Sequence, residues 1–101
     1  MATDKDFCEY VCECLSVAGE ITARPMMGEY LVYFEGVLVG DICDNRLLLK
    51  QTPTSLSLLG ECAKDFPYQG SKTLMIVADN FEDRELFASV LRGMKNDLIK
   101  K

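Results

Sequence analysis

Cysteine thiols are the side chains of this sequence with the widest range of chemistry, and five are present: Cys8, Cys12, Cys14, Cys43 and Cys62. The first three form a Cys-x₃-Cys-x-Cys run, which suggests a metal or iron–sulfur site. This spacing departs from the Cys-x₂-Cys pairs of such sites, and the chain has no histidine to complete a ligand set. We therefore predict no cofactor and small, partly buried thiols. A metal or redox role for Cys8, Cys12 and Cys14 stays open as the alternative.

The missing histidine also removes Cys–His and Ser–His pairs and the commonest general base. Asp and Glu number 16, but the sequence marks out no carboxylate pair in an apolar setting. Gly28, Gly36 and Gly40 do not form the G-x-G-x-x-G run of a phosphate-binding loop. We predict that the protein is not an enzyme, with a small enzyme of unknown reaction as one alternative.

Charge argues against nucleic acid as a partner of this chain alone. The 101 residues carry a net charge of −5, whereas domains held to a phosphate backbone are usually basic. The one basic cluster comprises Lys95, Lys100 and Lys101. The first fifty residues hold four Lys/Arg and nine Asp/Glu, and the rest holds seven of each. We expect a protein partner to contact the acidic half, and keep a DNA-associated transcriptional regulator component as an alternative.

Length and hydropathy predict a single domain over residues 1–101, because 49% hydrophobic and 27% charged residues are typical of one globular unit of this size. The first residues lack the apolar region of a signal peptide, and no apolar run approaches a membrane span. An odd number of cysteines argues against a disulfide framework. We expect a cytoplasmic protein with no membrane contact.

Hydrophobic periodicity predicts helices and strands in the order α-β-β-β-β-α-β-α. The fold class is α+β, with helices packed on a mostly antiparallel sheet. The expected helices cover residues 4–18, 54–64 and 81–99, and the expected strands cover 21–24, 30–34, 37–43, 46–50 and 73–78. Two-residue turns at 35–36 and 44–45 join the middle strands into a three-stranded meander.

Regular pairing across these turns sorts the meander into two faces. One face, expected under the helices, comprises Leu31, Tyr33, Leu38, Gly40, Ile42, Leu47 and Leu49. The other face comprises Tyr30, Val32, Phe34, Val37, Val39, Asp41, Cys43, Arg46, Leu48 and Lys50. This second face is either covered by the rest of the chain or exposed as a contact surface. In the second case we favour a homodimer through this face or through a neighbouring strand edge, with Asp41 and Arg46 as a charged pair in a polar rim. In that case Val39→Asp separates the dimer without unfolding it.

The segment from Ala23 to Lys50 resembles the N-terminal domain of the TfoX/Sxy family, regulators of natural competence. The matching positions are Arg24, Met26, Gly28, Tyr30, Tyr33, Gly36, Leu47, Leu49 and Lys50, and Phe66-Pro67-Tyr68 is also similar to the family. Met27, Glu29 and Leu48 depart from it, since Phe, Gly and Tyr are usual there. Full regulators carry a second, helical domain, so the resemblance implies a short stand-alone member.

What the resemblance implies is a non-enzymatic regulatory and protein-interaction module that binds a partner protein or a second copy of itself. The residues expected to bind this partner are Arg24, Met26, Met27, Tyr30, Val32, Val39, Asp41, Arg46 and Leu48. The resemblance places residues 24–28 in the loop that leads into the meander. Arg24 either anchors an acidic partner or forms an ion pair with the first helix.

Overall fold

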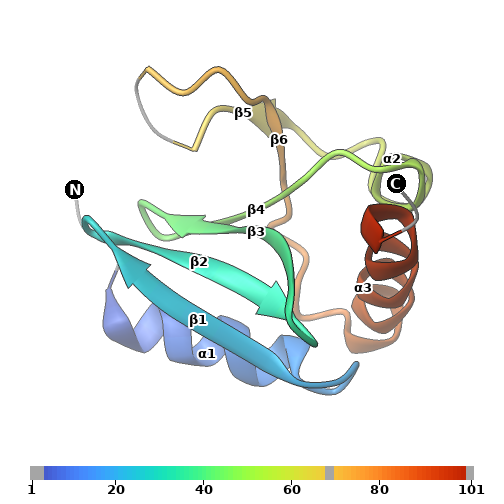
Figure 1. The fold of residues 1–101 in the computed structure, drawn as a ribbon, viewed down its shortest axis with the longest axis horizontal. Coiled ribbons are helices and arrows are strands. Elements are labelled where there is room, and N and C mark those ends of the chain that lie inside the picture. The colour runs from blue at the N-terminus through green and yellow to red at the C-terminus, as the bar shows by residue number, and fades with distance from the viewer. Residues whose placement is uncertain (1–3, 68–69, 100–101) are drawn as a thin grey trace.

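A computed structural model describes residues 4–67 and 70–99 and confirms the α+β fold. Six strands form one antiparallel sheet in the order β1-β2-β3-β4-β6-β5, and three helices accompany it (Figure 1). The predicted order of elements is correct apart from one additional strand. Tyr68 of the family-like run and Lys100 and Lys101 of the basic cluster lie outside the described residues.

The first four strands form a meander: β1 (Ile21–Met26), β2 (Glu29–Phe34), β3 (Val37–Cys43) and β4 (Arg46–Leu49). Three two-residue turns join them, and both residues of each turn have a positive φ, as tight hairpin turns require. The loop predicted over residues 24–28 shrinks to Met27 and Gly28, because β1 continues through Pro25. A proline is tolerated there since β1 is an edge strand, whose outer N–H groups have no ladder partner.

After the meander the chain forms a short helix and returns to the sheet. Helix α2 (Pro53–Leu58) begins after Thr52, whose side-chain oxygen accepts a hydrogen bond of 3.1 Å from the Ser55 backbone N–H. Strand β6 (Met75–Val77) pairs with β4, and β5 (Lys64–Asp65) pairs with the other edge of β6. The sequence does not predict β5, because two exposed charged residues carry no strand periodicity.

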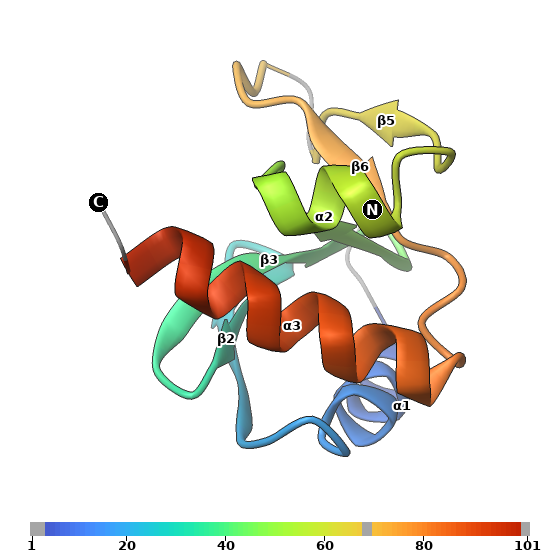
Figure 2. The ribbon, with the colours of Figure 1, turned by 90° about the vertical axis from the view of Figure 1, so that its right-hand side faces the viewer.

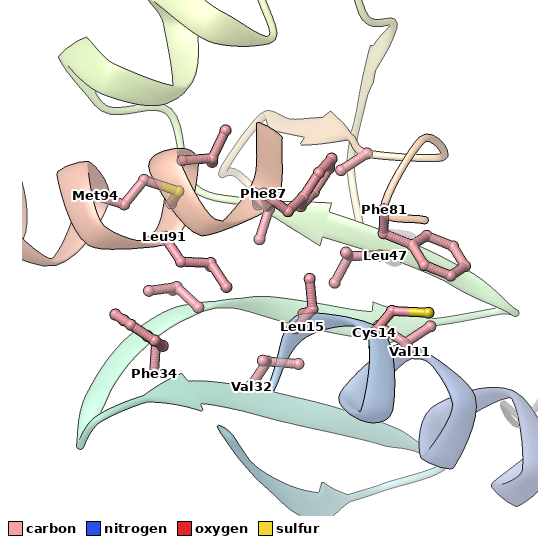
Figure 3. Packing of buried hydrophobic residues seen from close by; sticks show 14 of the residues in the cluster. Val11, Cys14, Leu15, Val32, Phe34, Leu47, Phe81, Phe87, Leu91 and Met94 are labelled. Carbon is pink, nitrogen blue, oxygen red and sulfur yellow. The ribbon is translucent and has the colours of Figure 1, made fainter. Parts of the chain in front are cut away.

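Helices α1 (Lys5–Leu15) and α3 (Arg84–Ile99) pack on one face of the sheet, and α2 packs beside α3 (Figure 2). Their buried side chains interdigitate with those of the central strands (Figure 3). The largest fully buried members of this core are Leu15, Phe34, Ile42, Leu47, Leu49, Leu59, Ile76, Phe87, Leu91 and Met94. None of the helices in the described part of the chain is long and apolar enough to cross a membrane.

A β-bulge in β3 reverses part of the predicted face assignment. Leu38 pairs with Tyr33 and Gly40 pairs with Val32, which leaves Val39 as an extra residue between them. Val39 and Ile42 therefore both reach the core under the helices, together with Val32 and Phe34 of β2. Ile42, Leu47 and Leu49 were assigned correctly to this side. The assignment was wrong for Leu31, Tyr33 and Leu38, which lie on the face away from the helices, and for Val32, Phe34 and Val39, which lie beneath them.

Candidate functional site: the open sheet face

The sheet face opposite α1 and α3 carries no helix over β1, β2 and β3 in the described part of the chain. We call it the open face and define it by Arg24, Met26, Leu31, Tyr33, Leu38 and Asp41. All six side chains are half-buried or exposed, and none belongs to the core under the helices. Pairing aligns Arg24 with Leu31, and Leu31 with Asp41, in a row that crosses three strands. The surface thus combines apolar side chains with both signs of charge.

Arg24 lies flat on the open face. Its guanidinium carbon is 5.9 Å from the centre of the Tyr33 ring, which is a cation–π distance. It makes no ion pair with any described residue. The predicted alternative of an ion pair between Arg24 and the first helix is wrong, because α1 lies under the other face of the sheet. The charge of Arg24 is therefore available to a partner.

A pair of carboxylates lies on the same face of the sheet, Glu29 on β2 and Asp41 on β3. Glu29 is only 8% exposed; its Oε2 accepts a weak hydrogen bond of 3.8 Å from the Cys43 thiol, and its Oε1 has no partner among the described residues. Burial raises the pKa of Asp41 to about 6; the nearby charge of Glu29 raises this pKa too, while Lys50 opposes the shift. The sequence does not mark out this pair, because only the pairing of β2 with β3 brings Glu29 and Asp41 near each other.

Glu29 is the site residue that sequence reasoning missed. In the sequence, Glu29 is distinguished only by its departure from the family pattern, where glycine is usual. Its proximity to Asp41 depends on the pairing of β2 with β3 and on the bulge that sets the register there. A regular register places Asp41 on the other side of the sheet from Leu31, whereas the bulge pairs the two.

Several of the predicted partner-binding residues lie elsewhere. Val32, Val39 and Leu48 are completely buried in the monomer, so they cannot line an exposed surface. Tyr30 packs against the core on the helix side. Leu48 instead joins Cys43, Met75 and Val77 in a small apolar cluster across the outer strands.

The other predicted residues are exposed or form an ion pair with a residue that was not predicted. Met27 is 98% exposed at the tip of the β1–β2 turn, and Met26 is 42% exposed at the end of β1. Arg46 forms an ion pair of 2.8 Å with Asp65 of β5, so the predicted pairing with Asp41 is wrong. The bulge and the additional strand β5 together explain this change of partner.

The five thiols are free. Within residues 4–67 and 70–99, no group of three or more His, Cys, Asp or Glu side chains is placed to hold a metal ion. Burial is the main cause that raises the pKa of Cys8, Cys43 and Cys62, and it raises the pKa of Cys12 to about 12. Raised pKa values leave little of the reactive thiolate near neutral pH.

We therefore expect slow alkylation of the native thiols. At about pH 7.5 iodoacetamide should modify the folded protein at least about tenfold more slowly than the urea-unfolded chain, because thiolate formation and access are both suppressed. Mass spectrometry of digested samples gives the rate at each cysteine. One cysteine that reacts as fast in the folded protein as in urea would reveal an activated thiol and contradict this account.

Asp41 should make stability depend on pH. Because its folded-state pKa is raised to about 6, the folded protein holds a proton there that the unfolded chain releases near pH 4. The resulting stabilisation is complete below the unfolded pKa and is lost as the pH rises through about 6. We expect Asp41→Asn to be more stable than the wild type by about 1–2 kcal/mol near pH 7.5 and nearly equal to it near pH 4. Urea unfolding of dilute protein measures both; an equal difference at the two pH values contradicts the prediction.

Comparison with known proteins gives the chain a relative. No family model and no solved structure matches it. An uncharacterized 12.7 kDa protein of Spirochaeta aurantia, described as lying in the trpE 5′ region, is 32% identical to it over 92 residues. That match covers 91% of this chain and 80% of the Spirochaeta protein. The chain belongs to the same family as this Spirochaeta aurantia protein.

Proposed function

We propose that the protein is a non-enzymatic regulatory module that binds a partner protein through the open face, in the manner implied by its resemblance to the N-terminal domain of TfoX/Sxy regulators. The observation that carries the proposal is that, within residues 4–67 and 70–99, no helix covers this face over β1, β2 and β3, while the face carries apolar side chains and an arginine without an ion pair. A cytoplasmic location accords with this role.

The open face has the composition of a protein contact. Leu31, Tyr33 and Leu38 form a half-buried apolar and aromatic centre, and the more exposed Arg24 and Met26 flank it. Tyr, Met and Arg are the side chains that protein interfaces enrich. A partner that covers this centre removes apolar area from water, which is the main driving force for association.

The polar part of the open face also favours a protein partner. Glu29 and Asp41 outnumber Arg24 here, so the surface suits a partner that contributes a basic side chain and repels a phosphate backbone. This supports a protein contact over a DNA contact.

Affinity capture with matched variants tests the proposal. Leu38→Asp places a charge in the open face, and Leu56→Asp places the same charge on α2, where Leu56 is 42% exposed. Bait made from the wild type or from Leu56→Asp should retain the same protein, either a cellular partner or an untagged copy of the chain. Leu38→Asp should lose it. Equal retention by all three baits, or retention of nothing by any of them, contradicts the proposed function.

A further inference from the structure

We propose that the open face binds the open face of a second copy of this chain, with Arg24 of each copy paired to Asp41 of the other across a twofold axis. This inference rests on the proposed function and names the partner. It follows from the register of β1, β2 and β3, which lie side by side in Figure 1. In a twofold interface every contact occurs twice, so the same surface has to supply both members of each pair.

The sheet register gives the required symmetry. Arg24 pairs with Leu31 on one side, and Asp41 pairs with Leu31 on the other. Neighbouring strands are about 4.8 Å apart, so the two charged residues lie at equal distances on either side of Leu31. A twofold axis that runs along β2 above Leu31 therefore places Arg24 of each copy opposite Asp41 of the other.

The same rotation brings apolar side chains together at the centre. Leu31 meets its own counterpart, and so does Tyr33, because both lie on β2. Thr22 and Leu38 both pair with Tyr33, so Thr22 of one copy faces Leu38 of the other. An apolar centre with ion pairs toward the sides is the usual anatomy of a protein interface. Facing sheets pack about 10 Å apart, a gap that the long arginine side chain can cross.

The charges on the open face are better completed by a second copy than by the chain itself. Arg24 has no ion pair among the described residues. A guanidinium offers its N–H donors in a planar fork, which can contact both carboxylate oxygens of the half-buried Asp41. A different protein would have to match a cation and an anion at the same spacing, whereas the second copy carries this spacing already.

Complementary charge variants test the arrangement. The wild type should have the mass of a dimer in size-exclusion chromatography with light scattering. Arg24→Glu makes both positions acidic and Asp41→Lys makes both basic, so each variant alone should be a monomer. An equimolar mixture should restore the dimer, because both contacts are then between opposite charges. Arg84→Glu, the same charge change at an exposed residue of α3, should leave the dimer intact.

The outcomes distinguish a failure of the homodimer from a failure of the proposed function. A wild-type monomer at high concentration overturns the homodimer but leaves a different partner on the open face, which the capture experiment detects. A dimer that survives Arg24→Glu overturns the arrangement, since association then uses another surface. If circular dichroism shows that Asp41→Lys does not fold, the masses of Arg24→Glu and Arg24→Ala test the arrangement instead. Both variants should be monomers, and a dimer of either would overturn it. Arg24 is exposed, so its substitution leaves the core intact.

Discussion

Val39→Asp should unfold the protein. Val39 is completely buried among the core side chains beneath α1 and α3, and the bulge leaves it no route to the open face. A carboxylate there loses its hydration without gaining a partner, and the apolar contacts of the valine are lost as well. The expected cost is about 4–5 kcal/mol, which is comparable to the whole stability of a small domain.

Leu38→Asp is the matched control, because Leu38 precedes Val39 and points to the open face. It is half-buried there, so an aspartate keeps much of its hydration, and the variant should remain folded. Circular dichroism and urea unfolding compare the two variants directly. A folded Val39→Asp that differs from the wild type only in oligomeric state would support the regular register expected from the sequence and refute the bulge.

Gly40→Ala should be the second most damaging of these substitutions. A Cβ at position 40 would lie 2.1 Å from the Leu48 carbonyl oxygen and 3.0 Å from the Leu49 Cα. Both atoms belong to the backbone of β4, which pairs with β3 at this point, so neither can move without breaking the ladder. We expect a loss of about 2–4 kcal/mol from distortion of the central sheet.

Gly36→Ala is the control variant, because it tests the cost of replacing a glycine where no other strand approaches. Gly36 has a φ of +85°, and a Cβ there would meet nothing within 4 Å. Its substitution should therefore cost only the strain of a left-handed backbone, about 1 kcal/mol. Urea unfolding of both variants provides the comparison. If Gly40→Ala is no more destabilised than Gly36→Ala, β3 and β4 do not approach each other as closely as described.

The local signals in the sequence were sufficient for most of the fold. Helical periodicity located α1 and α3, and Glu35-Gly36 and Asp44-Asn45 located two turns with positive φ at both residues. The third turn, Met27–Gly28, is not predicted, because the sequence analysis applies the rule that a proline such as Pro25 ends a strand. That inference holds for a central strand, and whether a strand is central or at an edge is decided by the whole sheet.

The candidate site depended on a nonlocal feature that no local pattern marks. Arg24, Met26 and Asp41 were predicted as contact residues and do lie on the open face. Val32 and Val39 were predicted there and lie in the core, because one extra residue in β3 reverses which side chains face the helices. The bulge is stabilised by contacts of β3 with both neighbouring strands, so the sequence of β3 alone does not reveal it.

Photo-cross-linking in the cell tests the central claim that the open face is the contact surface. A benzoylphenylalanine in place of Tyr33 lies in the middle of the open face, and the same group in place of Leu56 lies on the exposed side of α2. Irradiation should give a protein adduct from position 33, whether to a second copy or to another protein, and none from position 56. An adduct from position 56 alone, or from neither position, would contradict the account.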